Sequence, residues 1–152
     1  MSLIVAPAGT ADLPDLAALR AAFWADQCAK GLREPAPGCT PDDLAKLVGR
    51  PRTHLLVAHG DEGMAGYLFG VTRLVPGAVV QKVSSVEEVM TWPGLRQGGV
   101  ARALVLAATE RFAADGANRV QLRVLTNNAE AARFWDRLGF APYLTTMEKL
   151  LP

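Results

Sequence analysis

Apolar residues recur at helical spacing in three parts of the chain. The first part follows Asp12, a residue type that favours helix starts. The second begins near Gly99, and the third begins at Asn128 and ends before Gly139, a residue type that favours the left-handed conformation after a helix. The apolar positions of the three faces are Leu16, Leu19 and Phe23; Val100, Ala103, Leu104, Ala107, Ala108 and Phe112; and Ala131, Phe134, Trp135 and Leu138. This spacing predicts three amphipathic helices.

Shorter apolar stretches between these helices predict strands. Residues 54–59 and 64–74 are joined by a turn-rich tetrapeptide, which predicts an antiparallel hairpin. Further strands are expected over residues 2–7, 86–91, 119–125 and 140–151, and residues 79–83 either extend or precede the strand at 86–91. The order of elements is that of an α/β or α+β fold with a mixed sheet covered by helices.

Glycine and proline interrupt the segment between residues 30 and 52. The sequence there leaves room for one short helix over residues 42–48. We therefore interpret this segment as a mobile cap over the domain.

Length and composition narrow the class of protein. With 152 residues, we expect a single domain over residues 1–152. No apolar run approaches the ~20 residues that span a bilayer, and the first residues lack the pattern of a secretion signal. A net charge of +1 gives no general positive electrostatic field that would attract nucleic acid. We expect a soluble cytoplasmic protein that binds neither nucleic acid nor membrane.

The two cysteines, Cys28 and Cys39, lack metal-ligand spacing and a companion histidine cluster. Reduced thiols fit this usage better than a disulfide framework, although a bridge between the two stays an alternative. We expect no metal site.

A glycine-rich turn joins the strand at 86–91 to the second helix. It runs Arg96, Gln97, Gly98, Gly99, Val100, Ala101. Paired glycines let backbone N–H groups converge, and the start of a helix attracts anions, so the turn is a candidate phosphate cradle. Its spacing matches neither the dinucleotide fingerprint nor the nucleoside-triphosphate loop. A tight turn without any ligand explains the two glycines equally well.

Two motifs in sequence order favour the cradle. Arg96-x-x-Gly99-x-Ala101 resembles the Q/R-x-x-G-x-G/A acyl-CoA signature of the GNAT N-acetyltransferase superfamily. The segment from Asn128 to Phe140 resembles that family's N-x-x-A-x-x-F-Y-x-x-x-G-F pattern. The resemblance is strongest over residues 86–140 and weak over residues 30–53. It implies a mixed, mostly antiparallel central sheet flanked by helices, with two strands splayed around the cofactor.

The resemblance also implies a binding site for acetyl-CoA, the donor substrate. Backbone amides from Gln97 to Arg102 would hold the pyrophosphate, and the main chain of residues 89–91 would pair with the pantetheine arm. A β-bulge near Glu88 or Met90 is expected, because bulges redirect strand groups beside active sites. The residues implied in cofactor binding are Val89, Met90, Thr91, Arg96, Gln97, Gly98, Gly99, Val100, Ala101, Arg102, Asn128 and Trp135.

An amine acceptor requires a base that removes its proton, and this sequence departs from the family at the position of the general acid. Deprotonating an amine with a lysine-like pKa costs about 4.6 kcal/mol at pH 7. Neighbouring strand residues point to opposite faces, so only one of Glu87 and Glu88 can face the acceptor, and Glu88 is favoured. The alternative is that both are solvated or ion-paired. Trp135 stands where many relatives have the tyrosine that protonates the departing thiolate, and its position favours core packing. Tyr67 and Tyr143 are candidate replacements.

These observations predict an acetyl-CoA-dependent N-acetyltransferase that acts directly on a primary amine of a small molecule. An aminoglycoside-like molecule, an amino acid and a polyamine are candidate acceptors, and a protein N-terminus or lysine is an alternative. A non-catalytic acyl-CoA-binding or regulatory module is a second alternative, and a structural domain is a third. Homodimers are common in the family, which leaves a homodimer open.

Overall fold

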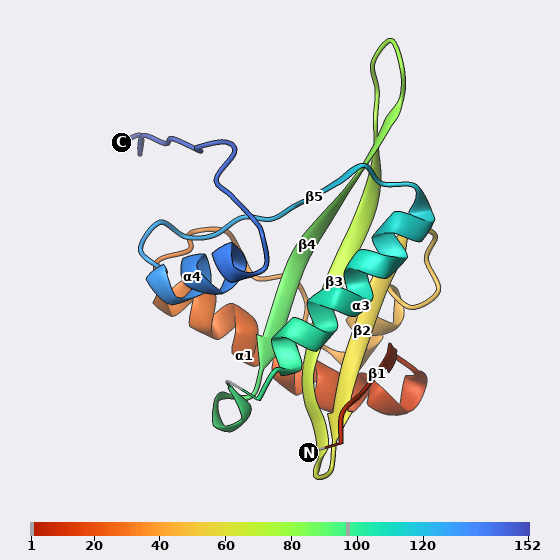
Figure 1. The fold of residues 1–152 in the computed structure, drawn as a ribbon. Helices are drawn as coiled ribbons and strands as arrows, with labels where there is room; N and C mark the ends of the chain where they lie inside the picture. Colours follow the sequence, from red (N-terminus) through yellow and green to blue (C-terminus); the bar gives the residue numbers. More distant parts are fainter. Residues whose placement is uncertain (1, 97) are drawn as a thin grey trace.

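One five-stranded sheet forms the centre of the molecule (Figure 1). The computed structural model describes residues 2–96 and 98–152. The strands lie in sequence order, β1-β2-β3-β4-β5, and all neighbours are antiparallel except the parallel pair β4 and β5. They are β1 (Ile4–Pro7), β2 (Thr53–Gly60), β3 (Gly63–Val75), β4 (Gln81–Thr91) and β5 (Arg119–Gln121). The predicted mixed, mostly antiparallel sheet is confirmed.

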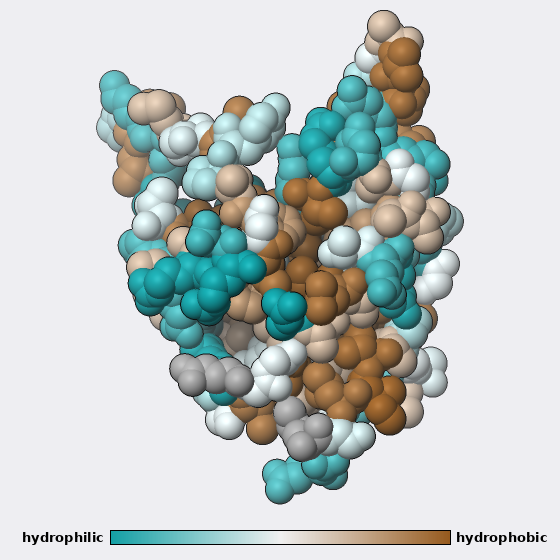
Figure 2. All heavy atoms as spheres, viewed as in Figure 1, coloured by the Kyte–Doolittle hydropathy of each residue, from teal (hydrophilic) through white to brown (hydrophobic). Residues whose placement is uncertain are grey.

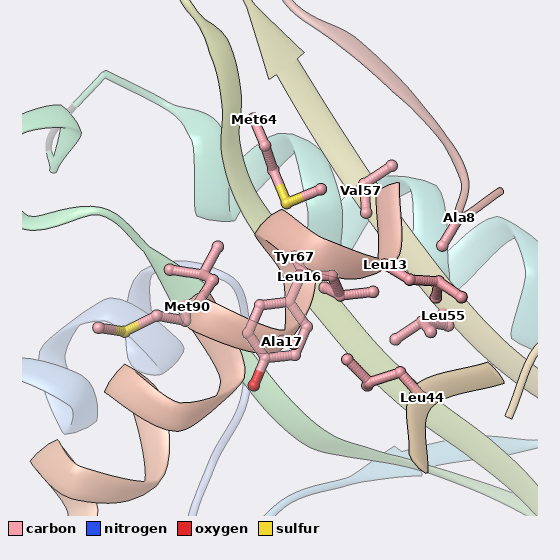
Figure 3. Packing of buried hydrophobic residues seen from close by; sticks show 11 residues of the cluster. Ala8, Leu13, Leu16, Ala17, Leu44, Leu55, Val57, Met64, Tyr67 and Met90 are labelled. Atoms are coloured by element: carbon pink, nitrogen blue, oxygen red, sulfur yellow. The ribbon is translucent and has the colours of Figure 1, made fainter. Parts of the chain in front are cut away.

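Helices cover both faces of this sheet. They are α1 (Leu13–Ala29), α2 (Pro41–Ala45), α3 (Val100–Asp115) and α4 (Ala129–Arg137), with short 3-10 turns at Thr10–Asp12 and Pro93–Leu95. Alternate residues of β2 face opposite cores: Leu55 and Val57 pack with α1 and α2, whereas Leu56 packs with α3 and Trp135 of α4. Figure 3 shows the first of these cores, in which Tyr67 of β3 lies beneath α1.

Helix boundaries follow the predicted signals closely. Asn128 caps α4 by accepting a hydrogen bond from the Ala131 N–H at 3.2 Å. Gly139 follows α4 with φ of 89° in the left-handed region, as predicted. The short helix of the cap begins earlier than expected, at Pro41, because the hydroxyl of Thr40 caps its first turn, and it ends at Ala45. Hydrogen bonds from Asn127 to the Lys30 carbonyl and from Arg20 to the Gly38 carbonyl anchor the segment between α1 and α2.

Two predicted strands are wrong in extent. The strand expected over residues 119–125 ends at Gln121, and residues 140–151 form no strand among the described residues. Residues 119–125 alternate in sequence, but a strand also requires a neighbouring strand to receive its N–H and C=O groups. In the part of the chain that the structure describes, residues 122–125 and 140–151 have no such neighbour.

The two histidines tie helices to strands. His54 Nε2 lies 2.7 Å from Asp115 Oδ2 at the end of α3, and His59 Nε2 lies 2.8 Å from Asp12 Oδ1 before α1. Burial opposes ionisation of Asp115, but its hydrogen bonds with His54 and Thr72 outweigh this and lower its pKa. Both histidines therefore have structural partners.

Cys28 and Cys39 are free thiols. Residues 2–96 and 98–152 contain no cluster of histidine, cysteine and carboxylate side chains suited to a metal ion. In the same residues, no helix has the length and apolar character needed to cross a bilayer.

Replacing Gly70 by alanine should destabilise the fold by about 1–3 kcal/mol. A Cβ at Gly70 would lie 2.5 Å from Phe112 Cζ and 3.0 Å from the Ser85 carbonyl oxygen, and Phe112 is packed in the core and cannot move aside freely. Urea unfolding measures the effect. Gly94→Ala is the matched control, because a Cβ there meets no atom within 4 Å; equal stability of the two variants would contradict the packing.

Candidate active site

The sheet opens between β4 and β5. β5 pairs with β4 only from Val83 to Ser85. Beyond Ser85, β4 continues to Thr91 without a strand on this side among the described residues. The backbone groups along this edge of Val89, Met90 and Thr91 are therefore available to an extended ligand.

A β-bulge lies in β4 immediately before Glu88. Phe69 pairs with Glu88 and Gly70 pairs with Val86, so Glu87 is the extra residue. The predicted bulge near Glu88 is confirmed. It shifts the alternation of β4: Val86 packs in the core with α3, whereas Glu88 contacts α1.

This bulge corrects the expectation that the two glutamates point to opposite faces. Glu88 contacts Arg20 of α1 and Tyr67, and Glu87 contacts Arg73, which lies on the same face of β3 as Tyr67. The extra residue breaks strict alternation, so both carboxylates lie on the side of the sheet that α1 covers. Simple strand periodicity could not reveal this.

Glu88 is buried within a hydrogen-bonded cluster. Its carboxylate accepts from Arg20 Nε at 2.9 and 3.0 Å and from Arg20 Nη2 at 2.6 Å. Trp24 Nε1 and the Tyr67 hydroxyl donate to Oε2 at 3.2 and 3.0 Å. Both carboxylate oxygens are thus occupied by donors, as a buried charge requires.

Tyr67 is held in this cluster as a hydrogen-bond donor. Burial, reinforced by the Glu88 carboxylate and the hydrogen bond to it, raises the pKa of Tyr67 well above its usual value. Tyr143, the other candidate acid, is exposed in the segment after α4.

Glu87 is more accessible than Glu88. Its side chain is 29% exposed, against 2% for Glu88. Arg73 Nη2 and Ser85 Oγ donate to Oε1, each at 2.6 Å. Because the contacts of Glu87 involve only Oε1, Oε2 is the carboxylate oxygen that faces no donor among the described residues.

The start of α3 provides the candidate phosphate cradle. Gly99 caps α3 with φ of 78°, in the left-handed region that favours glycine. No side chain caps this helix, and its first backbone bond runs from the Ala103 N–H to the Gly99 carbonyl. Among the described residues, the N–H groups of residues 100–102 therefore have no backbone acceptor, and they lie at the positive end of the helix dipole. Arg96 is exposed beside them, whereas Gln97 lies outside the described residues.

One buried polar atom near this edge lacks a partner. Thr91 Oγ1, at the end of β4, is the buried side-chain oxygen without a hydrogen bond in the described part of the chain. Buried hydroxyls are normally satisfied, so the atom marks a place for a ligand group or a water molecule. It lies in the strand whose edge is open, which fits a ligand laid along β4.

Asn128 and Trp135 both have structural roles. The Asn128 side-chain oxygen is used in capping α4. Trp135 is buried and stacks edge-to-face on Phe134 and Phe140, with ring centroids 4.9 and 5.2 Å away. Contact of either residue with a cofactor stays a prediction.

Comparison with known proteins now decides the family. The sequence pattern of the Acetyltransferase (GNAT) family matches residues 16–140. The chain belongs to the GNAT family. A curated relative, mycothiol acetyltransferase of Brachybacterium faecium, is 32% identical over 104 residues, which are 66% of this chain and 31% of the relative. The chain thus spans about a third of that protein's length.

Solved structures share the GNAT fold at low sequence identity. A mutant of the BH1408 protein from Bacillus halodurans has a TM-score of 0.84 at 20% identity, with 98% of this chain and 99% of that chain covered. The aminoglycoside N-acetyltransferase AAC(6')-Iy in complex with CoA has a TM-score of 0.80 at 18% identity, with 99% and 95% covered.

Arg20 is the site residue that sequence reasoning missed in this GNAT domain. It lies on the buried face of α1 between Leu16 and Trp24, at the same helical spacing as the apolar residues. A charged residue on an apolar face needs a buried partner, and a glutamate in a strand was available. That combination was the signal for the Arg20–Glu88 pair.

Proposed function

We propose that this GNAT domain transfers an acetyl group from acetyl-CoA directly to a primary amine of a small molecule. The observation that carries the proposal is the open edge of β4 beside the uncapped start of α3. An extended thioester with a diphosphate needs a strand edge for its amides and clustered N–H groups for its phosphates. The chain offers both, next to each other in sequence.

The residues present fit such a donor. The N–H groups of residues 100–102 would hold the pyrophosphate, with Arg96, Gly98 and Arg102 nearby; Gln97 is implied by its place in the sequence motif. The main chain of residues 89–91 would pair with the pantetheine amides, and the Thr91 hydroxyl would gain the partner it lacks. When bound, acetyl-CoA supplies an activated acyl group whose carbon an amine attacks.

The protein's own contribution is positioning and removal of a proton from the amine. Glu88 and Glu87 are the candidate carboxylates. Because donors occupy both oxygens of Glu88, we assign Glu88 the positioning of Tyr67 and Trp24, and we assign proton removal, directly or through water, to Glu87. The greater exposure of Glu87 supports this division.

The acceptor is proposed as a small amine rather than a polymer. Structural neighbours include proteins named as aminoglycoside acetyltransferases, one of them in complex with sisomicin, and they share the fold at 16% identity. Asp26 of α1 and Glu34 and Asp43 near α2 add little negative charge for a cationic acceptor, because Asp26 is paired with Lys30, Glu34 with Arg123, and Asp43 with Thr40. On the strength of these neighbours alone, an aminoglycoside is the first probe, before amino acids, polyamines and peptide amines.

A second candidate is a domain that binds acyl-CoA without catalysis. Trp135 supports it, since an indole cannot protonate a thiolate and this side chain is buried among aromatic rings. The Tyr67 hydroxyl, which donates a hydrogen bond to Glu88 and has a raised pKa, also supports the non-catalytic candidate. Against it, a thiol pKa near 8.5 makes unassisted departure of the thiolate at pH 7 lose only about 2 kcal/mol of driving force.

Turnover with a panel of amines separates the two candidates. We expect CoA thiol to be released and the amine to gain one acetyl group by mass spectrometry, while the intact protein gains none. Glu87→Gln should reduce kcat/KM by about 10²-fold or more, with Glu62→Gln in the exposed β2–β3 turn as the matched control. Binding of acetyl-CoA without release over the whole panel would favour the non-catalytic module.

A further inference from the structure

Three side chains of β3 and β4 form a hydrogen-bonded cluster on the side of the sheet that α1 covers. Arg73 of β3 donates from Nη2 to Glu87 Oε1 at 2.6 Å and from Nη1 to Ser85 Oγ at 2.9 Å. Ser85 Oγ donates to the same Glu87 oxygen at 2.6 Å. Arg73 and Glu87 therefore present a positive and a negative group in direct contact.

A second guanidinium acts on this cluster from the chain after β5. Arg123 donates from Nη1 and Nη2 to the two carboxylate oxygens of Glu34, at 2.6 and 2.9 Å. These hydrogen bonds raise the pKa of Arg123, and the Glu34 and Glu87 charges add to this against the effect of burial. Arg123 is thus within electrostatic reach of Glu87, the carboxylate to which we assign proton removal.

The charge that this cluster turns toward solvent is mainly positive. The side chains of Arg73 and Arg123 are 61% and 74% exposed, against 29% for Glu87 and 47% for Glu34. Both arginines make their contacts through Nη1 and Nη2, and neither Nε–H group has an acceptor among the described residues. The two guanidinium groups therefore keep donors that can bind an anion from solution.

The same charges disfavour a polycation as the acceptor. Glu34, Glu87 and Glu88 each have an arginine partner already. An aminoglycoside or a polyamine carries several ammonium groups, which would lie against exposed guanidinium groups, and like charges repel. An acceptor that suits the cluster carries one amine and one anionic group.

We propose that the acceptor is an α-amino acid, whose amine lies at Glu87 Oε2 and whose carboxylate accepts hydrogen bonds from Arg73 and Arg123. The inference rests on the proposed acetyl transfer and names the substrate class of the same site. Glu87 Oε2 faces no donor among the described residues, so it is open to the amine. Because the opposite charges of Arg73 and Glu87 touch, the matching ligand carries its own two charges close together.

The other side of the sheet presents a different surface. Figure 2 shows apolar surface there, between α4 and α3. The donor is proposed to lie along the edge of β4 and at the start of α3. The charged groups of an amino acid find their partners on the side that α1 covers, so donor and acceptor approach β4 from opposite sides.

The transfer is balanced in protons and electrons. The ammonium group of the amino acid gives one proton to Glu87, directly or through water, and its nitrogen then bonds to the acetyl carbon. The thioester C–S bond breaks, and the sulfur takes its electron pair and one proton. The second proton of the ammonium group leaves as the amide forms. The N-acetyl amino acid keeps its carboxylate but has no charge on nitrogen, so its attraction to Glu87 is lost.

Competition between matched amines tests the class of acceptor. Each of a panel of L-amino acids is offered together with its carboxamide, which keeps the side chain and the amine and lacks only the carboxylate charge. The amine of the carboxamide loses its proton more readily, so a preference for the acid cannot come from amine basicity. We expect kcat/KM for the acid to be at least about tenfold higher. Equal use of acid and carboxamide, or a preference for an aminoglycoside or a polyamine, would overturn the inference and leave the acetyl transfer intact.

Arg123→Gln tests the contact with the carboxylate. It should raise the KM for the amino acid about tenfold and leave the KM for the carboxamide and the Kd for acetyl-CoA unchanged. Arg119→Gln is the matched control, because it removes the same charge from β5, where Arg119 contacts Gln81 and Asn118. Equal KM values for the amino acid in the two variants would contradict the proposed contact.

A double variant excludes an indirect effect of Glu34. Arg123→Gln/Glu34→Gln removes the guanidinium without leaving the Glu34 carboxylate unpaired. It should show the same rise in KM for the amino acid as Arg123→Gln. A wild-type KM in the double variant would overturn the inference, because the single variant would then act through the unpaired carboxylate.

Calorimetry separates failure of this inference from failure of the proposed function. The amino acid is titrated into protein saturated with CoA, which measures recognition without turnover. Binding by the wild type that is about tenfold weaker in Arg123→Gln, without CoA release from acetyl-CoA, would retain the amino-acid site and overturn the acetyl transfer. Neither binding nor acetylation of any amino acid by the wild type would overturn the inference, and acetylation of another amine would then still uphold the proposed function.

Discussion

Replacing Arg20 by methionine should lower the free energy of unfolding by about 3–5 kcal/mol. The change leaves the Glu88 carboxylate buried without its counter-charge, and only the hydrogen bonds from Trp24 and Tyr67 remain. The effect is large because water cannot reach a carboxylate whose side chain is only 2% exposed. Guanidinium unfolding at pH 7 measures it.

Two further variants show whether the loss comes from the unpaired charge. Arg20→Met/Glu88→Gln removes both charges and leaves an amide oxygen for Tyr67 and Trp24, so it should recover much of the lost stability. Lys30→Met breaks a pair with Asp26 in which both side chains are about one-third exposed, and should cost only about 0.5 kcal/mol. If Arg20→Met costs no more than Lys30→Met, the Arg20–Glu88 pair does not stabilise the fold.

Replacing Ala101 by glutamate should raise the Kd for acetyl-CoA at least about tenfold without weakening the fold. Ala101 is the second residue of α3, where a carboxylate interacts favourably with the helix dipole. The same carboxylate would stand beside the N–H groups proposed for the pyrophosphate and would repel it. Helix stability and donor binding should therefore change in opposite directions.

Titration calorimetry and thermal unfolding measure these two effects. Ala101→Gln is the matched control, because it adds nearly the same volume without the charge. We expect its Kd to lie much nearer the wild-type value than that of Ala101→Glu. Equal affinity of the two variants would mean that the pyrophosphate binds elsewhere.

Much of the fold followed from local patterns. Helix starts and ends at Asn128 and Gly139 were predictable because capping depends on residues close in sequence. The turn at Gly99 was predictable for the same reason. The hairpin of β2 and β3 followed from two apolar stretches and a short polar turn.

What could not be predicted depends on contacts between distant residues. The bulge at Glu87 arises from the register between β3 and β4, and it brings both glutamates to one side of the sheet. Arg20 and Glu88 are separated by 68 residues, and only the packing of α1 on β4 joins them. The strand predicted over residues 140–151 was wrong, because a strand depends on a neighbour for backbone pairing and the described residues supply none there.

A crystal structure of the protein grown with acetyl-CoA reveals directly where the donor binds. We expect the pyrophosphate on the N–H groups of residues 100–102, and pantetheine amides paired with the main chain of residues 89–91 along the open edge of β4. The group nearest the thioester carbonyl should come from the side of the sheet that α1 covers. An acetyl-CoA molecule bound elsewhere, with the edge of β4 unpaired, would refute the proposed donor site.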